Sequence, residues 1–188
     1  MASSRLRAVI APQARVLNIL WGAFLAAPFL YTGLGWLISR EPRPDAGVGA
    51  GAGAGAGVPV GLLQVVFLLV GTGAVAASYL YPRRALADER LRALLRGPLP
   101  GTPPPGVVGL EPVEQRLALL FPRYQAVQIV VLALRESLAV FGLVLVILTG
   151  NFLMMVPWSV AAVGLITTAP PRPAEFLDRA LPVARAAG

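Results

Sequence analysis

Four long apolar segments constrain this chain more than any other feature of its sequence. They run from Val16 to Ile38, from Val58 to Tyr81, from Ala126 to Leu148 and from Phe152 to Ala169. A bilayer core about 30 Å thick is crossed by about 20 residues of apolar helix, so each segment has close to the length of one crossing. Only 13% of the residues are charged, whereas soluble domains carry about 25%. The sequence therefore predicts an all-α integral membrane protein with four transmembrane helices.

The connections between these segments predict two antiparallel hairpins. Only Thr149, Gly150 and Asn151 separate the third segment from the fourth, which predicts a tight turn. The first and second segments are joined by a longer loop in which Gly and Ala alternate from Val48 to Gly57. This alternation gives no helical or strand face to bury, and Gly has a high ordering cost, so we expect a flexible linker there.

The arginines predict how these hairpins are oriented. With four crossings, one side of the membrane carries nearly all of them, and the other side carries only Arg40 and Arg43 beside Glu41 and Asp45. Because cytoplasmic loops are enriched in basic residues, both termini and the central loop are predicted to be cytoplasmic, in an inner (plasma) membrane. Anionic lipid head groups are the expected partners of these arginines, and no nucleic acid is expected. The arginines on the predicted cytoplasmic side are Arg5, Arg7, Arg15, Arg83, Arg84, Arg90, Arg92, Arg96, Arg116, Arg123, Arg172, Arg179 and Arg185.

The chain is accordingly divided into a first hairpin with an N-terminal arm (1–82), a cytoplasmic loop (83–125) and a second hairpin with a tail (126–188). In the loop, Arg83 to Arg96 predicts a short helix with an apolar face, suited to the membrane surface or to docking on another protein. The apolar face consists of Ala87, Leu91, Leu94 and Leu95. A Pro/Gly linker follows from Gly97 to Gly109, and a second short helix is expected from Glu111 to Pro122. We expect the loop as a whole to be a solvated connector.

Arg135 and Glu136 lie near the middle of the third segment. A charged residue at the centre of a membrane helix costs about 2.5–3.5 kcal/mol, so two such residues indicate a specific role. Neighbours on a helix point about 100° apart, so at least one of the two should face another helix, another subunit or water. This pair, with Ser137, is the predicted site for helix docking or ion binding.

Small residues near this pair predict close helix packing. They are Ala139 and Gly142 in the third segment and Gly71, Gly73 and Ala77 in the second. Small side chains let helix backbones approach closely in lipid, which would shield the Glu136 carboxyl from solvent.

The two hairpins also suggest an internal duplication. At an offset of 110 residues, Asn18 aligns with Gln128 and Tyr31 with Phe141. The second and fourth segments both end at Pro-Arg, at Pro82 and Pro171. Apolar helices match easily by chance, so the sequence leaves duplication and coincidence equally open.

From Glu136 the chain reads ESLAVFGLV. This stretch resembles the ion-carrying helix of the proteolipid (c-type) subunits of rotary ATPases. In those subunits a mid-membrane carboxylate precedes small and apolar residues and then an aromatic-Gly-Leu step, as Phe141-Gly142-Leu143 stands here. The resemblance implies that Glu136 binds a proton or a sodium ion. Arg135 departs from the family pattern, which usually has an apolar residue at that position.

Composition removes most enzymatic chemistry. The chain has no cysteine and no histidine, and thus neither the thiolate nucleophile nor the commonest general base and metal ligand. We therefore expect no enzyme activity, no metal and no cofactor. The favoured hypothesis is a non-catalytic subunit or assembly component that associates with other membrane subunits or with itself. The alternative is an ion-coupled component, either proteolipid-like or a small transporter, with Glu136 as its carboxylate.

Overall fold

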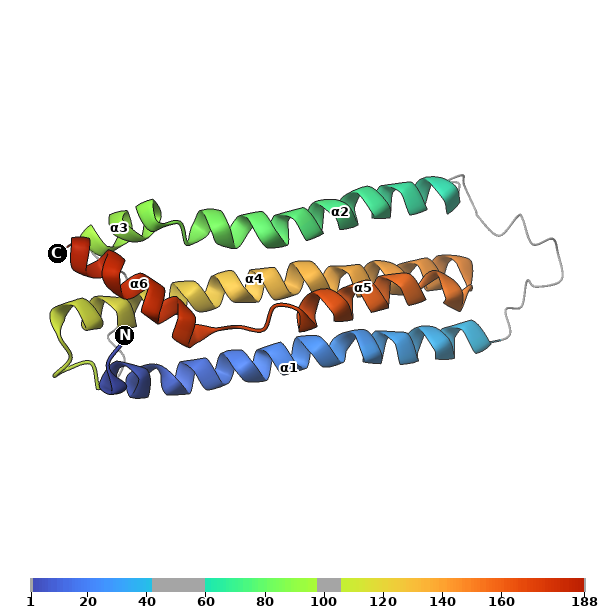
Figure 1. Ribbon diagram of the computed structural model, residues 1–188. Coiled ribbons are helices and arrows are strands. Elements are labelled where there is room, and N and C mark those ends of the chain that lie inside the picture. The colour runs from blue at the N-terminus through green and yellow to red at the C-terminus, as the bar shows by residue number, and fades with distance from the viewer. Residues whose placement is uncertain (1, 42–59, 98–105, 188) are drawn as a thin grey trace. The chain divides into compact units, whose positions relative to one another are not determined.

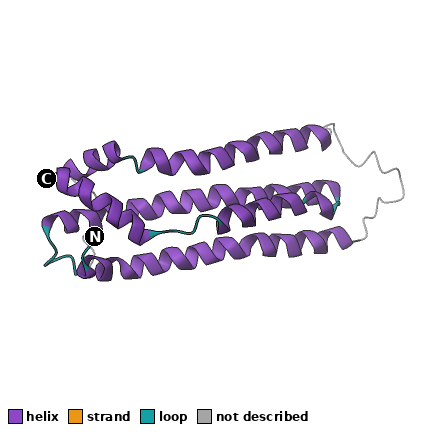
Figure 2. Ribbon diagram, viewed as in Figure 1, coloured by secondary structure: helices purple, strands orange, loops and turns teal. Residues whose placement is uncertain are grey.

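The computed structural model describes residues 2–41, 60–97 and 106–187, and every regular element in these ranges is a helix (Figures 1 and 2). The prediction of an all-α chain is confirmed for these residues. The predicted Gly-Ala linker and most of the Pro/Gly linker lie outside them. In chain order the elements are α1 (Ser4–Arg40), α2 (Val60–Ala85), α3 (Asp88–Arg96), α4 (Pro112–Thr149), a 3-10 turn (Phe152–Met154), α5 (Val156–Thr167) and α6 (Pro173–Ala187).

Three of the described helices, α1, α2 and α4, are long and apolar enough to cross a membrane. Their apolar residues are the ones that the first three sequence segments single out. Helix α4 also absorbs the separate short helix predicted from Glu111 to Pro122. It continues through Pro122 because one buried face runs along the helix on both sides of that proline. This face includes Leu117, Phe121, Tyr124 and Val127.

The fourth segment is a shorter helix than predicted. Helix α5 has 12 residues, and the residues from Ala169 to Arg172 are not helical. Pro157 lies in the first turn of α5, where its missing N–H is tolerated. At the other end, the Thr167 hydroxyl donates to the carbonyls of Val163 and Gly164, and Pro170 and Pro171 cannot continue the helix.

The chain divides into two compact units, and several of its helices run through both. Unit 1 consists of Met1–Ala23, Ser78–Leu132 and Ala169–Gly188, and unit 2 of Phe24–Ala77 and Ala133–Thr168. Each is described below by itself.

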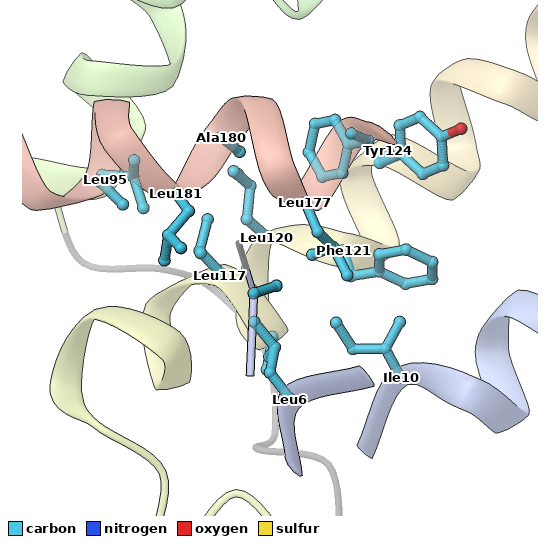
Figure 3. Close-up of a cluster of buried hydrophobic side chains, with 14 of the residues drawn as sticks. Leu6, Ile10, Leu95, Leu117, Leu120, Phe121, Tyr124, Leu177, Ala180 and Leu181 are labelled. Atoms are coloured by element: carbon cyan, nitrogen blue, oxygen red, sulfur yellow. The ribbon is translucent and has the colours of Figure 1, made fainter. Parts of the chain in front are cut away.

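Unit 1 has a hydrophobic core of large, fully buried side chains (Figure 3). Leu6 of α1, Phe121 of α4 and Leu181 of α6 are each at most 2% exposed. The ring of Tyr124 stacks on that of Phe176, with 4.3 Å between ring centroids. These contacts tie the beginning of α1, the beginning of α4 and α6 into one core.

Helix α3 packs on α6 and contributes to this core. Leu91 and Leu95, on the predicted apolar face, are each 1% exposed. The expectation of a solvated connector is therefore wrong for α3. Its apolar face is covered by this chain itself, because α6, predicted only as a tail, is an amphipathic helix with matching apolar residues.

Unit 2 has a much smaller buried cluster. Leu138, Ala139 and Ala162 are buried in it, and partly buried aromatic rings pack around them. Phe141 stacks on Phe67 at 5.4 Å and meets Trp158 edge-on at 6.2 Å between centroids. Many large apolar side chains of this unit are exposed instead; Leu30 of α1 is 72% exposed and Leu69 of α2 is 68% exposed.

Candidate functional site

Arg135 is the buried charge of unit 2. It lies on helix α4, and only 3% of the residue is exposed. Its guanidinium Nη1 donates a hydrogen bond of 2.9 Å to the carbonyl oxygen of Leu165. The predicted docking residue therefore binds the backbone of α5, an acceptor that needs no particular side chain.

A cation stabilises the C-terminal end of a helix such as α5. Leu165 lies in the last turn, where the final carbonyls lack a helical N–H partner and carry the negative end of the helix dipole. The Thr168 hydroxyl donates to the same Leu165 oxygen at 3.1 Å, and the Thr168 N–H donates to the Gly164 carbonyl at 3.1 Å. Arg135 thus completes a cap that the threonines begin.

Glu136 is directed to a different helix. Its Oε1 accepts a hydrogen bond of 2.8 Å from the hydroxyl of Tyr31 on α1. Because adjacent residues point about 100° apart on a helix, Arg135 can reach α5 while Glu136 reaches α1. Sequence reasoning missed Tyr31, although a tyrosine inside an apolar segment needs a polar partner for its hydroxyl.

A second polar contact joins α1 to α5. The hydroxyls of Thr32 and Ser159 lie 3.1 Å apart, and Thr32 Oγ1 also donates to the Pro28 carbonyl of its own helix at 2.7 Å. Ser159 is 8% exposed. Ser137, by contrast, donates to the Leu134 carbonyl of α4 at 2.8 Å, so this hydrogen bond is local and does not involve Glu136.

Two of the predicted packing glycines sit at close helix contacts. A Cβ added at Gly71 would lie 2.8 Å from Cζ3 of Trp158, and one added at Gly142 would lie 3.0 Å from Cβ of the same tryptophan. The two glycines therefore make room for Trp158, which sequence reasoning also missed. The polar partner found for Glu136 comes from α1, not from the small residues of α2.

The other packing candidates behave differently from one another. Ala139 is fully buried in the cluster of unit 2, and Ala77 is half-buried. Gly73 is exposed, and no described atom lies within 4 Å of a Cβ added there. Gly73 therefore packs against no other described helix.

The contacts of Arg135 and Glu136 are contacts between helices. Within the described ranges, no group of three or more acidic, histidine or cysteine side chains is placed to hold a metal ion. The one carboxylate of the pair has a tyrosine donor, and the one guanidinium caps a helix end. Comparisons of this chain with protein-family models, curated proteins and solved structures find no match.

Proposed function

We propose that the protein is a non-catalytic, multi-span membrane protein that serves as a subunit or assembly component of a larger membrane complex. One observation supports this most directly: each of the two charges in the apolar part of α4 is bonded to a different helix. Arg135 and Glu136 then act as docking residues that fix α5 and α1 against α4. Interhelical hydrogen bonds of this kind are a recurrent way of joining helices in lipid.

The proposal includes four membrane crossings, although only three described helices have full length. The 12 residues of α5 rise about 18 Å. Four non-helical residues, from Ala169 to Arg172, reach at most about 14 Å further when extended. The sum of about 32 Å matches a hydrocarbon core about 30 Å thick. The fourth crossing would thus be a short helix followed by an extended segment.

The side of each terminus follows from a belt of exposed arginines in unit 1, defined here as Arg15, Arg83, Arg84, Arg123 and Arg172. Two hydrogen bonds connect the segments that carry Arg15, Arg123 and Arg172. Gln125 Nε2 donates to the Gln13 carbonyl at 2.7 Å, and the Arg172 N–H donates to the Tyr124 hydroxyl at 3.0 Å. These contacts support one membrane boundary at the belt, with the termini on the cytoplasmic side and anionic lipid phosphates as ligands of the belt.

Association with other subunits is supported by surface that this chain leaves uncovered. In their most apolar stretches, only 11% of α1 and 17% of α2 is buried, against 44% of α4. Gly33 and Gly73 are exposed glycines with no described atom within 4 Å of an added Cβ. A helix of another subunit, or of a second copy, could approach closely at these positions.

The alternative, an ion-coupled component, is supported by the chemistry at Glu136. It is a half-buried carboxylate in an apolar segment, and its bond to Tyr31 leaves oxygen lone pairs free to bind a proton or a sodium ion. The resemblance to proteolipid subunits belongs to this alternative. The docking role takes precedence because a partner from this same chain is seen for each charge.

Glu136→Gln separates the two functions. The glutamine keeps an oxygen acceptor for Tyr31 but carries no charge. If docking is the role, the complex purified from native membranes in mild detergent should keep its mass, measured by light scattering. A wild-type protein that is always monomeric would contradict the subunit proposal.

Carbodiimide labelling across a range of pH gives the complementary result. These reagents attack protonated carboxyls in apolar surroundings. Labelling that requires Glu136 and fades at high pH, together with loss of ion flux in Glu136→Gln, would favour the ion-coupled alternative.

A further inference from the structure

We propose that the end of α5 is hydrated, with water reaching Thr167 and Thr168 from the proposed cytoplasmic side. The inference rests on the proposed membrane crossing by α5. It adds that water contacts the non-helical segment of the fourth crossing, from Ala169 to Arg172.

The depth of the helix end makes hydration necessary. If α5 begins at the outer boundary, its 12 residues end about 18 Å inward. Roughly 12 Å of a core about 30 Å thick then remains before the inner boundary. The chain covers that distance with non-helical backbone.

Backbone polar groups beyond the helix end have few partners in the chain itself. The carbonyls of Gly164 and Leu165 are satisfied by Thr167, Thr168 and Arg135. After them, Pro170 and Pro171 have no N–H, and their own carbonyls require donors. Lipid offers none, and lipid-exposed irregular backbone does not occur within the hydrocarbon region of membrane proteins.

The exposure of these residues favours water over protein as the donor. Thr167, Thr168 and Pro170 are all exposed, so the described chain does not cover the break. Thr167 and Thr168 carry hydroxyls at this exposed end of the helix, and Arg172, which is also exposed, follows four residues after Thr168 in the sequence. A hydrated helix end also helps to explain how a charge such as Arg135 is tolerated at this depth, since intramembrane charges usually face a bundle interior or water.

The chain lends itself to a direct test because it contains no cysteine. A single cysteine can be introduced at Thr168, at the end of α5, and the matched control is Val160→Cys, on the same helix and 66% exposed. A charged, membrane-impermeant maleimide is then added to inside-out vesicles. Because the thiolate is the reactive form and apolar surroundings keep the thiol protonated, we expect Thr168→Cys to react about tenfold or more faster than Val160→Cys.

Each outcome bears on a different proposal. Labelling of Thr168→Cys alone supports hydration. Labelling of neither variant, with both thiols reactive after denaturation in detergent, means that protein seals the break, and it overturns the inference while leaving the crossing intact. Rapid labelling of both variants means that α5 does not cross a membrane, and it overturns both proposals. Faster labelling of Val160→Cys overturns the inference as well.

Discussion

The two units of this chain differ in how they pack their large apolar side chains. Unit 1 buries Phe121, Leu6 and Leu17 completely in one large core and carries its arginines on the surface. Unit 2 has a smaller buried cluster, exposes many of its large apolar side chains and buries one arginine, Arg135. The first arrangement is that of a domain in water, and the second is that expected in lipid, where polar groups must be satisfied internally. The same chain thus indicates two different surroundings.

One interaction occurs in both units and shows what the surroundings change. In unit 1, Arg116 Nη1 donates to the Leu95 carbonyl near the end of α3. In unit 2, Arg135 Nη1 donates to the Leu165 carbonyl near the end of α5. Arg116 is exposed and Arg135 is buried. Water can replace the guanidinium of Arg116 at the Leu95 carbonyl, whereas the buried position that Arg135 takes beside the Leu165 carbonyl is closed to water, even where the exposed Thr167 and Thr168 are hydrated.

The largest expected difference between the units comes from removing an aromatic ring. Phe121→Ala should destabilise unit 1 by about 3–5 kcal/mol, because it opens a cavity in a packed core. Phe121 is fully buried, whereas Phe29 of unit 2 is 62% exposed. Phe29→Ala is the matched control and should change stability by no more than about 0.5 kcal/mol. Hydrogen exchange of the amides in α6 and α5, measured in nanodiscs, reports on the two units separately.

Comparable losses from Phe121→Ala and Phe29→Ala would contradict the division into a core unit and a unit with an apolar surface. A loss of protection in α6 that leaves α5 unchanged would sharpen it. That result would also show that unit 1 opens independently.

Removing the two helix-capping arginines should have unequal effects. Arg135→Leu should lower protection of the last turn of α5 by about 1.5–3 kcal/mol, the range for hydrogen bonds to charged groups. Arg116→Leu should lower protection of the last turn of α3 by about 0.3–1 kcal/mol, as for an exposed cation near a helix C-terminus. Hydrogen exchange at the Thr168 and Gly97 amides, each bonded to the carbonyl four residues earlier, measures both. Equal losses would mean that, once the arginine is removed, water reaches the Leu165 carbonyl as readily as the Leu95 carbonyl.

The bond between Glu136 and Tyr31 should have a smaller effect. Tyr31→Phe removes one interhelical hydrogen bond, and such bonds in membrane proteins contribute about 0.6 kcal/mol on average and up to about 1.7. A double-mutant cycle with Glu136→Ala, which removes the acceptor, is read as thermal stability in nanodiscs and isolates the coupling between the two residues. A coupling energy of zero would remove Glu136 from the docking site and leave Arg135 alone in that role.

Sequence reasoning succeeded where the signal is local. The apolar segments predicted α1, α2 and α4, because length and hydropathy are properties of one stretch of chain. The apolar face of α3, though not its burial by α6, was predicted for the same reason, since Leu91 and Leu95 are four residues apart. The position of the charged pair within an apolar helix also follows from sequence alone.

What the sequence did not reveal depends on contacts between distant residues. Helix α6 has apolar residues at helical spacing, such as Leu177, Ala180 and Leu181, but only its packing with Phe121 distinguishes a core helix from a tail. The partner of Arg135 is a backbone carbonyl, and a carbonyl has no sequence signature. Tyr31 was visible as a polar aromatic residue, yet its contact with Glu136 joins positions 105 residues apart.

The smallest expected effect is a response of unit 1 to acid. Asp178 of α6 accepts the Ala2 N–H at 2.8 Å and pairs with Arg7 at 3.2 Å. The backbone N–H of Ala2, with Arg7 beside it, holds the pKa of Asp178 below its ordinary value of 3.8. The stabilisation is therefore complete above that value and is lost as pH falls through the lower pKa of the folded state. Below about pH 4, amides at the start of α1 should lose protection.

Asp178→Asn keeps an oxygen acceptor for Ala2 but does not titrate, so its α1 amides should show no such additional loss. The end of α5 provides the internal reference, because the guanidinium of Arg135 stays protonated throughout this range. After correction for intrinsic exchange rates, protection at the Thr168 amide should therefore stay constant over the measured range, from about pH 6 to about pH 3. A parallel loss at both helix ends would mean that the two units respond to acid as one. That result would argue against treating their surroundings as separate.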